Sequence, residues 1–242
     1  MRRSLAFLLI ATLVLTAGCA VRPLPAPEQA LRQPALPASV NVAAGLAARN
    51  FVAVVARMEP LIESECRVRR PSVNCDFLIG VDDRPGEPPN AFQTLDRSGR
   101  PVVVFTLALI ATARNQDELA FVLGHESAHH LAGHIARAEE SALQGALIAG
   151  ALTALSGGSP ASIASAQQLG ATAGARRYSK DFELEADALG TIIAFNAGYD
   201  PLRGAAFFAR IPDPGDRFLG THPPNAQRLQ VVRDTVVLMS AS

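Results

Sequence analysis

The sequence predicts an α+β domain that is mainly helical around a small antiparallel sheet. Alanine is abundant, tryptophan is absent and aromatic residues make up 5% of the 242 residues, a composition that favours closely packed helices over a sandwich or barrel. Three short apolar runs between positions 77 and 105 are separated by turn signals and supply the expected sheet. Acidic and basic side chains balance at 22 each, without the basic stripe of a nucleic-acid-binding protein, so we expect no nucleic acid as a partner.

Residues 1–18 have the composition of an export signal. Two arginines precede an apolar stretch over residues 5–15, and small residues follow at positions 16–18. The apolar stretch is too short to span a bilayer. We therefore expect residues 1–18 to be a signal peptide that is removed during export.

Cys19 follows these small residues directly, so the segment resembles a bacterial lipobox, in which the cysteine is acylated and the chain is cut before it. An ordinary signal peptide with an incidental cysteine is the alternative. The residue after Cys19 is Ala20 rather than aspartate. By resemblance to lipoprotein sorting signals, this residue predicts a location on the periplasmic face of the outer membrane of a Gram-negative cell. Multiple acylation would bind the protein firmly to that membrane.

Prolines recur between residues 23 and 37, which predicts a solvated tether over residues 19–44 and a single domain over residues 45–242.

Export also bears on the remaining cysteines, because thiols in an oxidising compartment tend to pair. We expect a disulfide between Cys66 and Cys75, which would contribute roughly 2–3 kcal/mol on the chain-entropy model. Two free buried thiols are the alternative.

The first half of the domain is expected to contain one helix and the whole sheet. Apolar residues at helical spacing predict a helix over residues 46–65, with Pro60 as a kink or local break. The short runs 77–81, 91–95 and 101–105 predict strands of an antiparallel sheet of three or four strands.

Helices follow the sheet. Asn115 and Glu118 form a capping-box-like start for a helix that we expect to reach about residue 138. The Ala-rich run 141–155, a Gly-Gly-Ser-Pro break and a second helical run to about residue 196, interrupted near 170–175, predict a helical hairpin. We expect this hairpin to be buried, with a mobile lid as the alternative. A last helix is expected over residues 222–238.

The segment Gly124–His129 carries the clearest chemical signal, because it fits the pattern H-E-x-x-H within a predicted helix. Residues four apart lie on one helix face, so His125 and His129 can bind a single zinc ion. Glu126 lies about 100° round the helix, where it can act as a general base toward a water activated by the metal. His130 and His134 point away from this face, and we expect packing or polar contacts from them rather than metal binding.

Catalytic zinc needs a third protein ligand and one open position. The metzincin spacing is absent, because Ala132 and Ile135 stand where it requires glycine and histidine. The better candidate is Glu183 on the later helix, with Asp187 one turn on to accept the N–H of a ligating histidine. Glu185 should be an exposed charge.

These motifs together resemble the M48 family of zinc metallopeptidases, and in particular its soluble lipoprotein members in the bacterial envelope. The resemblance extends over roughly residues 75–232. Its matching segments are Asn90–Phe92, Glu118–Ala120, His125–His129 with His134, Tyr178–Lys180, Glu183–Gly190, His222-Pro223 and Arg228.

The resemblance implies a compact gluzincin-type fold and one zinc ion per chain, bound by His125, His129 and Glu183. It implies that Glu126 is the base and that Asp187 supports a ligand. It further implies that His222 lies near the metal, where it either stabilises the oxyanion or fills the open position, and that Arg228 is its companion cation. The expected substrates are misfolded or misassembled envelope proteins, with outer-membrane assembly factors as further partners.

Two other functions remain open at this stage. A chaperone or assembly factor would keep the zinc site mostly closed and act by binding its clients. A structural zinc lipoprotein would have four protein ligands and no position for water.

Overall fold

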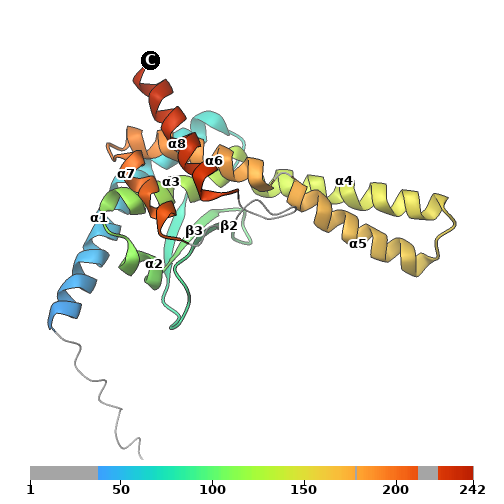
Figure 1. Cartoon of the computed structure of the whole chain (residues 1–242), viewed down its shortest axis with the longest axis horizontal. Coiled ribbons are helices and arrows are strands. Elements are labelled where there is room, and N and C mark those ends of the chain that lie inside the picture. Colours follow the sequence, from blue (N-terminus) through green and yellow to red (C-terminus); the bar gives the residue numbers. More distant parts are fainter. Residues whose placement is uncertain (1–37, 178, 212–222, 242) are drawn as a thin grey trace, which may run out of the picture. The chain divides into compact units, whose positions relative to one another are not determined.

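The computed structural model describes residues 38–177, 179–211 and 223–241 (Figure 1). Within these ranges the protein is a mainly helical α+β domain with one three-stranded sheet, as the sequence predicts. The predicted signal peptide, Cys19 and His222 lie outside the described residues. In the described ranges, no helix combines the length and the apolar character needed to traverse a bilayer.

Helix α1, Ala38–Arg69, begins earlier and ends later than predicted, and it runs without interruption through Pro60. Its first turns include residues 38–44, the end of the predicted tether. Residues at intervals of four, Val54, Met58, Ile62 and Cys66, are buried along one side. Cys66 forms a disulfide with Cys75, with 5.6 Å between their Cα atoms, and thereby fixes the end of α1 to the segment before the sheet.

The sheet contains β1 (Leu78–Asp82), β2 (Ala91–Leu95) and β3 (Pro101–Thr106) in the order β1-β3-β2. β3 is antiparallel to β2 but parallel to β1, so the prediction of an antiparallel sheet was wrong for one of the two strand pairs. The cause is the connection over residues 83–90, which carries the chain from one edge to the other. The tight turn at 96–100 then brings β3 back between the two edge strands.

Helix α2 (Leu107–Thr112) leads into α3 (Gln116–Ala132), which carries the H-E-x-x-H motif. Asn115 caps α3 by accepting a hydrogen bond from the Glu118 N–H at 3.0 Å. α3 ends at Gly133, whose φ of 70° is left-handed, so the predicted continuation to residue 138 was wrong. The next helix begins at once with His134 and has a new direction.

Helices α4 (His134–Leu155) and α5 (Pro160–Arg177) form the predicted hairpin, and α6 (Ser179–Asn196) follows (Figure 1). α5 runs through the interruption expected near residues 170–175. The expectation that the hairpin is buried was wrong, because its large apolar side chains are exposed. The two arms pack mainly on each other and meet the rest of the described domain only near their bases.

The C-terminal part comprises α7 (Pro201–Ala205), a short 3₁₀ helix (Ala206–Ala209) and α8 (Asn225–Ser240). α8 begins three residues after the predicted start at 222. It packs on α6 and α7, while α3 lies between α1 and α6. This arrangement buries the motif-bearing helix within the domain, where His125 contacts α6 and α8 and His129 contacts α6.

Candidate active site

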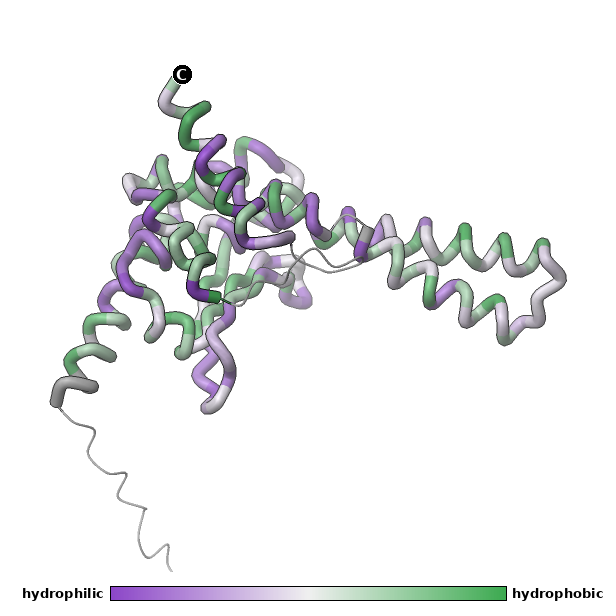
Figure 2. Tube along the Cα trace, in the orientation of Figure 1, coloured by the Kyte–Doolittle hydropathy of each residue, from purple (hydrophilic) through white to green (hydrophobic). Residues whose placement is uncertain are grey.

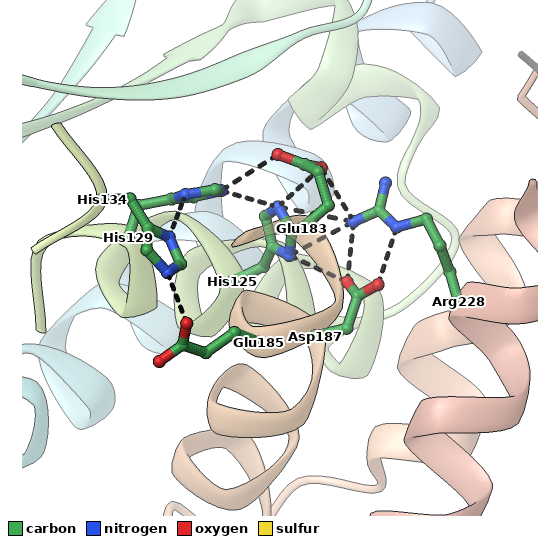
Figure 3. A network of polar contacts seen from close by, with 7 residues as sticks. All are labelled: His125, His129, His134, Glu183, Glu185, Asp187 and Arg228. Carbon is green, nitrogen blue, oxygen red and sulfur yellow. Dashed lines mark hydrogen bonds and ion pairs between the residues drawn. The ribbon is translucent and has the colours of Figure 1, made fainter. Parts of the chain in front are cut away.

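The structure brings His125, His129 and Glu183 together (Figure 3). The two histidines lie one turn apart on α3, with their Nε2 atoms 3.2 Å from each other. Glu183 reaches them from α6, with one carboxylate oxygen 3.6 Å from His125 Nε2 and the other 3.4 Å from His129 Nε2. Three potential ligands from two helices therefore converge on one point.

These separations fit a single zinc ion. Tetrahedral zinc holds nitrogen and oxygen ligands at about 2.0–2.1 Å, which places neighbouring ligand atoms roughly 3.3 Å apart. The two imidazole nitrogens lie 3.2 Å apart, and each has a different Glu183 oxygen at 3.4–3.6 Å, close to that value. The side chains are two imidazoles and one carboxylate, ligand types that zinc accepts, and among the described residues these three form the candidate set.

Close contact between α3 and α6 makes the convergence possible. A Cβ atom on Gly124 would lie 2.8 Å from the Gly190 carbonyl oxygen, and one on Gly190 would lie 2.7 Å from the His125 backbone nitrogen. Both values are shorter than side-chain contacts allow, so the two glycines permit a helix separation that larger residues would widen. The short separation lets the carboxylates of α6 reach the imidazoles of α3.

Asp187 and Arg228 fix the orientation of the His125 imidazole. Asp187 Oδ1 accepts a hydrogen bond from His125 Nδ1 at 2.9 Å, and the Arg228 guanidinium donates to both Asp187 oxygens at 2.7 Å. All three side chains are buried. Burial disfavours a charged imidazole, but the carboxylates of Asp187 and Glu183 outweigh it and raise the pKa of His125 to about 10. The site thus attracts positive charge at His125, where a proton and a metal ion compete.

A second network holds His129. His134 Nδ1 lies 2.8 Å from His129 Nδ1, and His134 Nε2 donates to Glu185 at 3.2 Å. Burial, with the neighbouring His129, lowers the pKa of His134 to about 4, so His134 is neutral at pH 7. With its one proton on Nε2, its Nδ1 accepts the proton of His129 Nδ1, which leaves His129 Nε2 free to bind metal.

The polar contacts expected of His134 are present, but its predicted direction was wrong, because a continuous helix would have directed it away from His129. The break at Gly133 turns it toward the site instead. Glu185 is exposed, as expected, but it also accepts a hydrogen bond from Arg137 at 2.7 Å and so links α6 to the base of the hairpin. His130 fits its expected packing role: it donates to the Asn74 carbonyl and lies edge-on against Phe77.

Glu126 lies beside the two histidines and lines the same cleft, which has a volume of about 1180 Å³. Burial raises the pKa of the Glu126 carboxyl, with the nearby imidazoles acting in the opposite direction. A raised pKa suits a group that takes up a proton during a reaction and later releases it. The cleft also contacts the edge strand β2 and the aromatic side chains Phe207 and Phe208.

Comparison with known proteins identifies the family. Residues 57–236, most of the chain, match Peptidase family M48. The chain belongs to this family. M48 is a family of zinc metalloendopeptidases, and the three converging side chains are the candidate metal site of this M48 member.

A relative in Vibrio cholerae serotype O1 (strain ATCC 39315 / El Tor Inaba N16961) bears the name "Putative beta-barrel assembly-enhancing protease". It is 34% identical to this M48 chain over 123 residues, which are 48% of the chain and 25% of the relative. The chain therefore spans only a quarter of that relative's length.

Proposed function

We propose that this M48 peptidase cleaves misfolded or misassembled proteins of the bacterial envelope, using one zinc ion held by His125, His129 and Glu183. The observation that carries the proposal is the convergence of three potential ligands, whose ligand atoms lie within 4.8 Å of one another, with Glu126 beside them in one cleft. This arrangement provides both a metal site and a base at the same place.

A zinc ion in such a site supplies Lewis acidity, which activates water at neutral pH and polarises a peptide carbonyl. Glu126 takes the proton from the attacking water and passes it to the leaving amine. Asp187 fixes His125, and His134 fixes His129, so that both imidazoles keep their Nε2 atoms directed to one point. His222 is proposed to stabilise the developing oxyanion or to fill the open position in a resting state.

The proposed location is the periplasmic face of the outer membrane, with a lipid on Cys19. Three observations support it: the lipobox-like segment before Cys19, a Cys66–Cys75 disulfide suited to an oxidising compartment, and a relative whose name refers to β-barrel assembly. Proteins engaged in outer-membrane assembly are accordingly proposed as substrates or partners. Cys19→Ser should abolish the incorporation of labelled fatty acid into the protein, as metabolic labelling and immunoprecipitation would measure.

Glu126→Gln tests the proposed chemistry. It keeps the size of the side chain and removes the base, so casein cleavage should fall by about 10²–10⁴ while zinc content stays at the wild-type value. Glu139→Gln, an exposed position on α4, is the matched control and should cleave normally. Full cleavage by Glu126→Gln would overturn the proposal, and an unchanged envelope phenotype in an inactive variant would favour a chaperone.

A further inference from the structure

The helical hairpin carries a long segment without charge. Residues 141–175, which form most of both arms and the turn between them, contain no Asp, Glu, Lys, Arg or His. Large apolar side chains nevertheless point outward along them. Leu143, Leu147, Ile148 and Leu152 of α4 are 59–62% exposed, Leu169 of α5 is 72% exposed, and Leu155 at the tip is 86% exposed. Figure 2 shows that hydrophobic residues recur along α4 as far as its tip.

Contact between the two arms uses small residues rather than these large ones. A Cβ atom on Gly145 would lie 2.1 Å from the Gly170 carbonyl oxygen, and one on Gly174 would lie 2.0 Å from the Ser141 carbonyl oxygen. The helices therefore meet backbone to backbone, which is how helices associate within bilayers. The leucines and the isoleucine are left for another partner.

Polar groups near the tip are satisfied within the hairpin itself. Thr153 donates to the Ala149 carbonyl at 2.9 Å, and Ser156 donates to the Leu152 carbonyl at 2.8 Å. In the turn, the Gly158 N–H donates to the Thr153 carbonyl at 2.9 Å. Helical backbone with hydroxyl groups bonded to it can leave water without losing hydrogen bonds, which a hydrocarbon environment requires.

We propose that the outward face of α4 and the tip of the hairpin insert into a lipid bilayer. A hairpin surface of this size that bound another protein would ordinarily include some charged residues to complement those of its partner. These 35 residues include none. From Leu143 to Leu155 the helix rises about 18 Å, against a hydrocarbon thickness of about 30 Å, so the hairpin can enter the bilayer from one side but is too short to cross it.

Charges return at the base of both arms, where the polar headgroups would lie. Glu139 and Glu140 are exposed on α4, and Arg176 is exposed on α5. Because both signs are present, attachment rests on apolar insertion and needs no anionic lipid. Ala138 and Ala175 at this base also line the active-site cleft, so insertion would hold the cleft beside the membrane surface.

A single tryptophan can report insertion, because the protein has none of its own. Leu152→Trp places it on the proposed inserting face, and Val68→Trp places it on α1 at a position that is 78% exposed. The full-length protein purified from cells is mixed with phosphatidylcholine vesicles that contain brominated acyl chains. The reporter measures where the hairpin lies, so an acyl group on Cys19 does not confound it.

We expect the Leu152→Trp emission to shift to the blue and to be quenched by the brominated chains, in 0.5 M NaCl as in low salt, with Val68→Trp unaffected. Adding Ile148→Asp should lower the inserted fraction at least about tenfold, with helicity unchanged by circular dichroism. Glu126→Gln should leave the quenching intact, which separates this inference from the proposed peptidase chemistry.

Three results would overturn the inference. An unshifted Leu152→Trp on vesicles would mean that the hairpin stays in water. Equal quenching of both reporters would mean unspecific adsorption of the whole chain. A blue shift that needs no lipid and grows with protein concentration would mean that a second copy covers this face.

Discussion

The two proposed histidine ligands are held by networks of opposite character (Figure 3). His125 is bonded to Asp187, whose charge is neutralised by Arg228 in a buried cluster. His129 is bonded to a neutral histidine, His134, and the carboxylate behind it is 46% exposed. Charge in the first network is isolated from water, whereas charge in the second is screened by it. Loss of the first network, which orients His125, should therefore have a far larger effect than loss of the second, which orients His129.

The largest effect is expected from Asp187→Ala, which leaves the Arg228 guanidinium buried without its carboxylate. The free energy of unfolding should fall by about 3–5 kcal/mol, and zinc affinity should fall about 10–100-fold. Urea denaturation and competition with a chelator measure the two quantities. Asp181→Ala, exposed on the same helix, is the control and should change neither. A loss of stability below about 1 kcal/mol would show that the buried cluster is not the stronger support.

An intermediate effect is expected from His134→Phe. The ring can still stack on Phe182, whose centroid lies 4.5 Å away, but the hydrogen bond to His129 is lost. Zinc affinity should fall about tenfold, with a smaller change in stability than in Asp187→Ala. His130→Phe is a matched control because the His130 side chain bonds to the Asn74 carbonyl and packs on Phe77, away from the three ligand candidates, and chelator competition should find its zinc affinity unchanged. Wild-type zinc affinity in His134→Phe would show that the second network does not support zinc binding.

The smallest effect is expected from Glu185→Gln. The carboxylate is half exposed, and a glutamine can still accept the His134 hydrogen bond, so zinc affinity should fall roughly threefold or less. The same chelator competition measures it. A fall as large as that of Asp187→Ala would erase the difference between the two networks.

The parts of the site that depend on local helix geometry could be predicted from the sequence. His125 and His129 converge because they are four residues apart on one helix, and Glu183 and Asp187 share a face of α6 for the same reason. What the sequence did not reveal was the end of α3. Arg70 donates to the His130 carbonyl at 3.0 Å from sixty positions away, so a long-range contact supports the turn at Gly133 that directs His134 inward.

The sheet and the hairpin show the same limit at larger scale. Each strand was located from its local pattern, but the parallel pairing of β1 with β3 depends on the path of the connection between them. The apolar pattern of α4 is the same whether its leucines meet protein or not. The packing of Gly145 on Gly170 and of Gly174 on Ser141, which the structure reveals, shows that small residues occupy the contact between the arms.

Zinc content and zinc-edge X-ray absorption of wild type and Glu183→Ala test the account most directly. We predict one zinc ion per wild-type chain, with two imidazole nitrogens and a carboxylate oxygen at about 2.0–2.2 Å and no sulfur. In Glu183→Ala the carboxylate contribution and most of the metal should be lost while the fold remains. Zinc bound in Glu183→Ala with the content and spectrum of wild type would contradict the proposed centre.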